Sequence, residues 1–117
     1  MPALDIFHDR VRRALEKDGW TITDDPLVIP FGTRRIFVDL GAERIIAAEK
    51  GALKIAVEVK SFTGPSPVND MQAALGQYQI YGSIIRRRLK GYQLFLAVPE
   101  VFYETFMQEP LDRKSVV

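Results

Sequence analysis

The fold of this chain is decided by residues 55–62, which read Ile-Ala-Val-Glu-Val-Lys-Ser-Phe. The stretch is apolar and rich in β-branched residues, which favours a strand in so short a run. It follows a turn at Gly51 and precedes the turn-forming sequence 63–67, Thr-Gly-Pro-Ser-Pro. We therefore predict a strand here, against which the other elements pack.

Two charged residues, Glu58 and Lys60, interrupt the inner end of this strand. They are two positions apart and share one face, while Ile55, Val57 and Val59 fill the other face. A carboxylate beside an ammonium suits metal-assisted hydrolysis, in which the acid binds a divalent cation and the lysine orients the attacking water. The alternative is an ordinary half-exposed strand, because a Glu-x-Lys pair is common on such a face.

Length and composition indicate one globular domain spanning residues 1–117, with 47% apolar and 26% charged residues. The absence of cysteine excludes disulfides, thiolate zinc sites and thiol catalysis. No apolar run approaches the length of a membrane span and the N-terminus lacks a secretory pattern, so a cytoplasmic protein is expected. A net charge of +1 leaves nucleic-acid binding open, because the placement of the charges matters more than their sum.

Residues 4–18 are expected to form an amphipathic helix that stops at Gly19. Its polar face carries His8, which is the only histidine in the chain. With no second histidine to share a metal, we expect this side chain to be solvated or hydrogen-bonded at the surface.

Extended segments separate this helix from the central strand. They are predicted at 20–23, 27–30, 34–40 and 45–50, with 27–30 limited by proline to an edge or a loop. A turn at 49–52 then leads directly into the central strand. We expect an antiparallel hairpin in which the arm 34–48 pairs with residues 55–60.

The position of the hairpin turn predicts which acids approach Glu58. A turn centred near residues 50–51 places Glu43 opposite residue 58, and a centre one residue later places it opposite Lys60. Asp39 has the same parity but lies further along the sheet, unless a bulge near Gly41 brings it back. One face of this hairpin could therefore present Asp39, Glu43, Glu58 and Lys60 together. The alternative is a solvated polar face with cross-strand ion pairs.

Residues 67–89 are predicted to form one long helix, with Ser66 as the N-cap and Pro67 at the first helical position. Apolar positions recur every three or four residues along it, at Val68, Met71, Leu75, Tyr78, Gly82, Ile85 and Leu89. Residues 92–98 are apolar enough for a buried strand. The central strand, the helix and this strand therefore form a unit with two parallel strands, and a short helix follows at 99–107.

Gln77 and Tyr81 lie four residues apart on the long helix, downstream of Glu58 and Lys60. This arrangement resembles the PD-(D/E)xK nuclease superfamily, in particular its RecB-like and Holliday-junction-resolvase-like branches, whose helix carries a Gln-x-x-x-Tyr signature. The resemblance implies a restriction-endonuclease-like α/β fold with three layers, in which a mixed central sheet is flanked by helices.

Five segments of the chain resemble a narrower group, the XisH family: 5–8 (Asp-Ile-Phe-His), 17–20 (Lys-Asp-Gly-Trp), 39–44 (Asp-Leu-Gly-Ala-Glu-Arg), 57–62 (Val-Glu-Val-Lys-Ser-Phe) and 74–78 (Ala-Leu-Gly-Gln-Tyr). Members are known as fdxN element excision controlling factors of cyanobacteria. The resemblance implies control of a programmed DNA rearrangement, with DNA, a site-specific recombinase and a companion XisI-type protein as partners. Members usually continue past the position of Pro110 into further strand-forming sequence, so the family's C-terminal strand is expected to be missing here.

Roles for individual residues follow from the resemblance. Asp39 or Glu43, together with Glu58, would hold Mg²⁺, Lys60 would position water, and Gln77 and Tyr81 would contact DNA or orient the lysine. Many relatives place a Glu on the first helix near a metal, and His8 stands at that position, where it is a further candidate ligand. We expect weak metal binding, with DNA cleavage slow or absent under simple conditions and dependent on partners where it occurs. The alternative is a non-catalytic module that binds DNA or the companion protein, as a monomer or a homo-oligomer.

Overall fold

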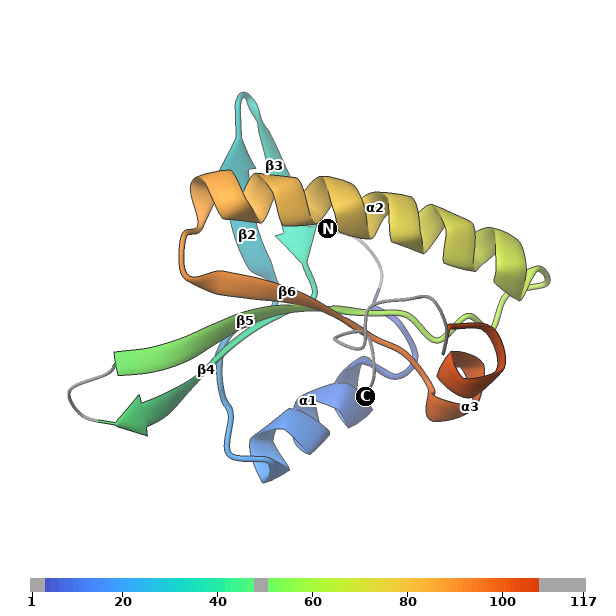
Figure 1. Ribbon diagram of the computed structural model, residues 1–117, viewed down its shortest axis with the longest axis horizontal. Helices are drawn as coiled ribbons and strands as arrows, with labels where there is room; N and C mark the ends of the chain where they lie inside the picture. Colours follow the sequence, from blue (N-terminus) through green and yellow to red (C-terminus); the bar gives the residue numbers. More distant parts are fainter. Residues whose placement is uncertain (1–3, 48–50, 108–117) are drawn as a thin grey trace.

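The computed structural model describes residues 4–47 and 51–107 of the chain. Figure 1 shows the elements, which follow one another as α1 (His8–Lys17), β1 (Thr21–Asp24), β2 (Leu27–Phe31), β3 (Arg34–Val38), β4 (Leu40–Ala47), β5 (Gly51–Val59), α2 (Pro67–Arg88), β6 (Tyr92–Ala97), α3 (Glu100–Phe102) and a π-helical turn, η1 (Tyr103–Met107). Residues 48–50 of the expected turn and the C-terminal tail lie outside the described residues. No described helix is both long and apolar enough to cross a membrane.

The main sheet is mixed and has the strand order β1-β4-β5-β6. Strands β5 and β6 are parallel, whereas β4 is antiparallel to both β1 and β5. Helix α2 covers one face of this sheet and α1 covers the other (Figure 1). The prediction of a three-layer α/β fold built on the strand at 55–60 is therefore confirmed.

Alternation along β5 separates the two cores. Val57 and Val59 pack with Val11 of α1 on one face. On the other face Ala56 packs with Ile84 and Ile85 of α2. Both faces of β5 are therefore buried, which accounts for its nearly continuous apolar sequence.

Helix α2 has almost the bounds that the sequence predicts. Pro67 occupies its first turn, although the side chain of Ser66 makes no capping hydrogen bond among the described residues. The apolar stripe starts one position later than expected, because Val68 is exposed and Met71 is the first of its residues to pack against the core. The Tyr78 hydroxyl donates to the Leu94 carbonyl oxygen at 3.0 Å, which links the middle of the helix to β6.

The predicted pairing of one long arm, 34–48, with the central strand is wrong. The arm is two strands: β3 pairs with β2 in a separate two-stranded sheet, and only β4 pairs with β5. The physical reason is local, since residues 32–33 form a two-residue turn between the paired residues Phe31 and Arg34, and Gly32 supplies a positive φ of 62°. The chain passes from the small sheet to the main sheet at Asp39.

The register of the β4–β5 hairpin also differs from the prediction. Ala47 pairs with Gly51, so the hairpin closes earlier than a turn centred at 50–51 would allow. Gly51, with a φ of 77°, begins β5 instead of forming the middle of the turn. Glu43 consequently lies opposite Lys54, and not opposite Glu58 or Lys60.

The first helix begins at His8, four residues later than expected. Asp5 precedes it and accepts a hydrogen bond from the Phe7 N–H at 2.9 Å. Its other carboxylate oxygen accepts from the N–H and the hydroxyl of Ser61, at 2.9 and 3.0 Å. Asp5 therefore ties the start of the chain to the residues that follow β5, which positions α1 against the sheet.

Candidate functional site

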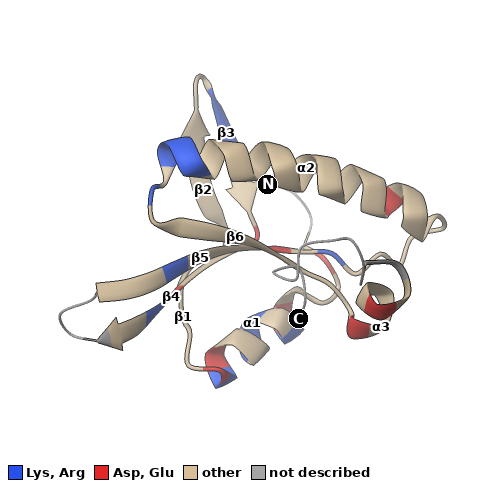
Figure 2. Cartoon of the chain, in the orientation of Figure 1, with Lys and Arg blue, Asp and Glu red and all other residues tan. Residues whose placement is uncertain are grey.

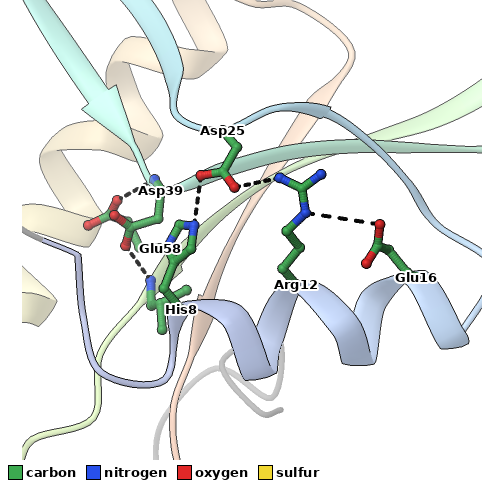
Figure 3. Close-up of polar contacts among 7 residues, drawn as sticks. His8, Arg12, Glu16, Asp25, Asp39 and Glu58 are labelled. Carbon is green, nitrogen blue, oxygen red and sulfur yellow. Dashed lines mark hydrogen bonds and ion pairs between the residues drawn. The ribbon is translucent and has the colours of Figure 1, made fainter.

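Asp39 and Glu58 form the centre of the candidate site. Asp39 stands at the junction of β3 and β4, and Glu58 is the second-last residue of β5. The Asp39 N–H donates to Glu58 Oε1 at 3.0 Å, and the Val59 N–H donates to Asp39 Oδ2 at 2.7 Å (Figure 3). These reciprocal bonds hold the two carboxyl groups side by side.

The pKa values of both carboxyl groups are raised above their usual values. Glu58 is only 5% exposed. Burial, followed by the negative charge of Asp39, raises the pKa of Glu58 from 4.5 to about 7. Burial also raises the pKa of Asp39, opposed by the hydrogen bond from Val59. Two ionised carboxylates are therefore unfavourable here, and a shared proton or a bound cation would relieve the repulsion.

Lys60 supplies a positive charge at the edge of this pair. Its Nζ lies 4.0 Å from Glu58 Oε2, and about a third of its side chain is exposed. The lysine is therefore close enough to Glu58 for an ion pair and open enough to meet a ligand. The structure thus places Lys60 beside Glu58, and Asp39 is hydrogen-bonded beside Glu58, while their role as a site stays a prediction.

A cleft of about 540 Å³ opens in front of the acids. Asp39, Glu58 and Lys60 line it from the sheet, and Gln77 and Tyr81 line it from α2. The last two residues are one helical turn apart, so their side chains point to the same side. The expectation that Gln77 and Tyr81 face the acids is confirmed.

Glu43, the other candidate acid, lies outside this cleft. It pairs with Thr21 of β1 and with Lys54 of β5. Its charge acts elsewhere: burial, then Asp24, then Glu43 raise the pKa of Tyr92. The structure thus brings Asp39, and not Glu43, next to Glu58.

His8 is buried, which corrects the prediction of a surface position. It is 2% exposed, and its Nε2 lies 2.7 Å from Asp25 Oδ1. Arg12 donates to the other oxygen of Asp25 at 2.6 Å, as Figure 3 shows. The helical pattern of residues 4–18 does not indicate this burial, because it depends on Asp25, which β1 and the following turn bring against the first turn of α1. The His8 Nδ1 atom is buried without a hydrogen-bond partner in the described part of the chain.

Sequence reasoning missed several residues of the cleft. Asp5 lines it from the N-terminal segment, and Phe31, Arg34 and Arg35 line it from the β2–β3 hairpin. The pair Arg34-Arg35 directly after the Gly32-Thr33 turn was a usable signal, because basic residues at a hairpin tip have no core to fill. The sequence predicts that residues 34–48 pair with the central strand and not with β2, so it does not link the two arginines to the acids.

The donor set limits which cation this site could hold. Among residues 4–47 and 51–107, no group of three His, Cys, Asp or Glu side chains is arranged to hold a metal ion. Asp39 and Glu58 provide two carboxylates, and the remaining positions would fall to water, backbone oxygen or substrate. Mg²⁺ is commonly bound in this way, through one or two carboxylates, several waters and substrate phosphates.

The fold and the cleft define a class: a three-layer α/β protein with a buried acid pair and a lysine where β5 ends. The chain belongs to the XisH family, since the family profile described as "XisH protein" matches residues 1–117. No curated protein matches it significantly.

Two crystal structures are similar to this chain. One is an XisH family protein from Nostoc punctiforme PCC 73102, with 46% identity and a TM-score of 0.76, over 94% of this chain and 80% of that one. The other is an fdxN element excision controlling factor protein from Anabaena variabilis, with 44% identity and a TM-score of 0.77, over 91% and 78%.

Proposed function

We propose that this chain acts on DNA to control excision of a DNA element, and that its cleft is a Mg²⁺-dependent site for phosphodiester hydrolysis. Membership of the XisH family and the description of the Anabaena variabilis relative support the role in excision control. The observation that carries the hydrolytic part is the buried pair Asp39–Glu58 with Lys60 Nζ 4.0 Å from Glu58. The resemblance to PD-(D/E)xK nucleases rests on Glu58 and Lys60 together with Gln77 and Tyr81.

Each residue has a role that its placement allows. Asp39 and Glu58 would hold Mg²⁺ through carboxylate oxygens, and the cation would polarise a phosphodiester and activate water. Lys60 would orient the attacking water and stabilise negative charge that develops on the phosphate. Gln77 and Tyr81, across the cleft on α2, would hold the DNA backbone or the lysine. Attack by water on phosphorus breaks one P–O bond and releases a hydroxyl end and a phosphate end.

The Mg²⁺ proposal is consistent with the chemistry of the donors. Burial raises the pKa of both acids, the charge of Asp39 raises the pKa of Glu58 further, and a divalent cation would favour their ionised forms. Within the described residues His8 does not join Asp39 and Glu58 as a third metal ligand, and its Nε2 is engaged with Asp25. Two carboxylates alone hold a strongly hydrated Mg²⁺ weakly. We therefore expect weak binding of Mg²⁺ and slow cleavage that depends on partners.

Cleavage assays with Lys60→Ala test the proposal. The wild type should cut duplex, branched or single-stranded DNA slowly with Mg²⁺ or Mn²⁺, more so with an XisI-type companion protein, and Lys60→Ala should not cut. Lys54→Ala is the matched control, because Lys54 is on the same strand but contacts Tyr92 instead of the acids. Equal cleavage by wild type and Lys60→Ala would reject this mechanism.

One observation favours a second candidate, a non-catalytic module that binds the companion protein or the recombinase complex. The bonds between Asp39, Glu58 and the backbone already satisfy one oxygen of each carboxyl group without a metal. A shared proton would complete the pair. This candidate predicts that Lys60→Ala retains binding to the companion protein and that no metal condition produces cleavage.

A further inference from the structure

The β2–β3 hairpin is a basic arm beside the acid cleft. It extends away from the main sheet and past α2 (Figure 1). Residues 26–38 include Arg34 and Arg35 and contain no Asp or Glu. Within the part of the chain that the structure describes, neither arginine forms an ion pair, so both charges are available to a ligand.

The C-terminal end of α2 extends this basic surface. Residues 71–99 contain no Asp or Glu, and their cations gather at Arg86, Arg87, Arg88 and Lys90, all exposed. Figure 2 shows the end of α2 and the hairpin coloured as cations on the same side of the molecule. The Arg88 guanidinium lies 6.0 Å from the centre of the Phe31 ring, which joins the helix to the hairpin. A helix dipole explains cations in the last turn of α2, but not the arginines of the hairpin.

Apolar and aromatic side chains are exposed between these cations. Phe31 is 42% exposed and Val28 is 40% exposed. Val28 pairs with Phe37 across the hairpin, and Pro30 pairs with Arg35, so these four residues share one face. The Arg35 guanidinium lies 6.0 Å from the centre of the Phe37 ring.

This composition fits unpaired bases better than a closed duplex. A duplex presents phosphates outward, and reading its grooves requires side chains that donate or accept hydrogen bonds, of which the Val28 face has only Arg35. Aromatic rings between arginines instead bind single strands, because bases stack on the rings while phosphates meet the cations.

The hairpin also leads to the proposed reaction centre. Phe31, Arg34 and Arg35 line the same cleft as Asp39 and Glu58. The two acids repel a phosphate backbone, so nearby cations are needed to bring DNA into this cleft. A strand seated on the hairpin would therefore pass the acids and Lys60.

We propose that the β2–β3 hairpin, with Arg86–Arg88 of α2, binds DNA that carries an unpaired strand next to a duplex. Bases of the unpaired strand stack on Phe31, which lies between Arg34 and Arg88, and the arginines hold its phosphates. The inference rests on the proposed function, because it assigns a substrate class to the same cleft.

Binding without cleavage tests this inference. Fluorescence anisotropy in EDTA would compare the full chain on a short duplex and on the same duplex with an unpaired arm of about ten nucleotides. The branched DNA should bind about fivefold or more tightly, and Phe31→Ala should remove most of that preference. Phe31→Tyr, which keeps an aromatic ring, should restore it. Arg34→Ala/Arg35→Ala should weaken binding and reduce the salt slope by about 1.4 to 1.8.

The control variant removes two positive charges from a different surface of the molecule. Arg13 and Lys17 are exposed on α1, on the opposite face of the sheet. Arg13→Ala/Lys17→Ala should therefore leave the preference for branched DNA unchanged, and circular dichroism would confirm that every variant is folded. Equal binding to both DNAs, or a preference that survives Phe31→Ala in a folded protein, overturns the inference.

The outcomes separate this inference from the catalytic proposal. If Phe31 determines the preference but no metal supports cleavage, the DNA surface is established and the catalytic proposal fails. If Lys60 is required for cleavage while the hairpin variants bind and cut like the wild type, catalysis is established and the inference fails.

Discussion

Glu58 titrates in the pH range in which this chain would ordinarily be handled. Burial and the neighbouring Asp39 raise its pKa from 4.5 to about 7, so the folded state holds this proton more tightly than the unfolded state. Raising the pH from about 4.5 through 7 therefore destabilises the folded state, by an amount on the order of 3 kcal/mol. This is the opposite of a salt-bridged carboxylate with a lowered pKa.

Glu58→Gln should accordingly stabilise the protein at high pH. Glutamine keeps an oxygen that accepts from the Asp39 N–H, but it never ionises. We expect a gain of about 1–3 kcal/mol in the free energy of unfolding at about pH 8 and a difference below about 0.5 kcal/mol at about pH 4. Urea unfolding at both pH values measures this. A variant less stable than the wild type at pH 8 would show that the charge of Glu58 is favourable.

The two candidate upstream acids can be separated by metal binding. At pH 8, Mn²⁺ or Mg²⁺ at ten times its Kd should stabilise the wild type by about 1.4 kcal/mol, seen as a rise of a few degrees in Tm. Asp39→Asn should abolish that rise, because it removes a carboxylate that faces the cleft. Glu43→Gln should keep it, since Glu43 lies opposite Lys54. A rise retained in Asp39→Asn would mean that the metal binds elsewhere.

Residue types at the site were predictable to different degrees. The pair Glu58 and Lys60 follows from strand alternation, and Gln77 and Tyr81 follow from helical spacing, because both periods are local. The choice between Asp39 and Glu43 depends on the register of β4 against β5. The burial of His8 depends on its contact with Asp25, seventeen positions away. Neither the strand register nor the His8–Asp25 contact can be inferred from a local sequence pattern.

Among the elements, α2 should contribute to stability chiefly through its sheet-facing side. Ile85 is 1% exposed in the core between α2 and the sheet, and Ile80 on the same helix is 60% exposed. Ile85→Ala should lower the free energy of unfolding by about 2–5 kcal/mol, because it removes buried methyl groups and leaves a cavity. Ile80→Ala should change it by less than about 0.5 kcal/mol. Chemical unfolding of both variants gives the comparison, and similar losses would mean that α2 packs through its other side.

The elements also show where sequence reasoning stops. The strand at 55–60, the helix at 67–89 and the strand at 92–98 were predicted because each has an uninterrupted period. The antiparallel hairpin into the central strand was also predicted, but with the wrong register, since its turn was assumed to centre on residues 50–51. The β2–β3 hairpin was not predicted. Gly32 and Gly51 both adopt positive φ, but one lies within a turn and the other begins a strand. The sequence shows a glycine at both positions but does not indicate which one lies in a turn and which one begins a strand.

Across the whole molecule, stability should decrease from the middle of the main sheet toward the β2–β3 hairpin. Strand β5 is hydrogen-bonded to β4 on one side and β6 on the other, whereas β2 and β3 bond only to each other within the described residues. Native-state hydrogen exchange should therefore be slowest in β5 and faster in the hairpin. Equal protection of the two regions would indicate that the packing of the hairpin on α2 makes the domain open as one unit.

The reciprocal bonds of Asp39 and Glu58 have a consequence for descent within this family. Glu58 accepts a hydrogen bond from the Asp39 N–H at the start of β4, and Asp39 accepts one from the Val59 N–H of β5. Loss of either acid would therefore remove a hydrogen bond that links these two strands. A lineage that abandoned DNA cleavage would still be under selection to keep both. Lys60 has no acceptor atom with which to hold a backbone amide. Its retention or loss among relatives would therefore record whether the proposed cleavage is in use.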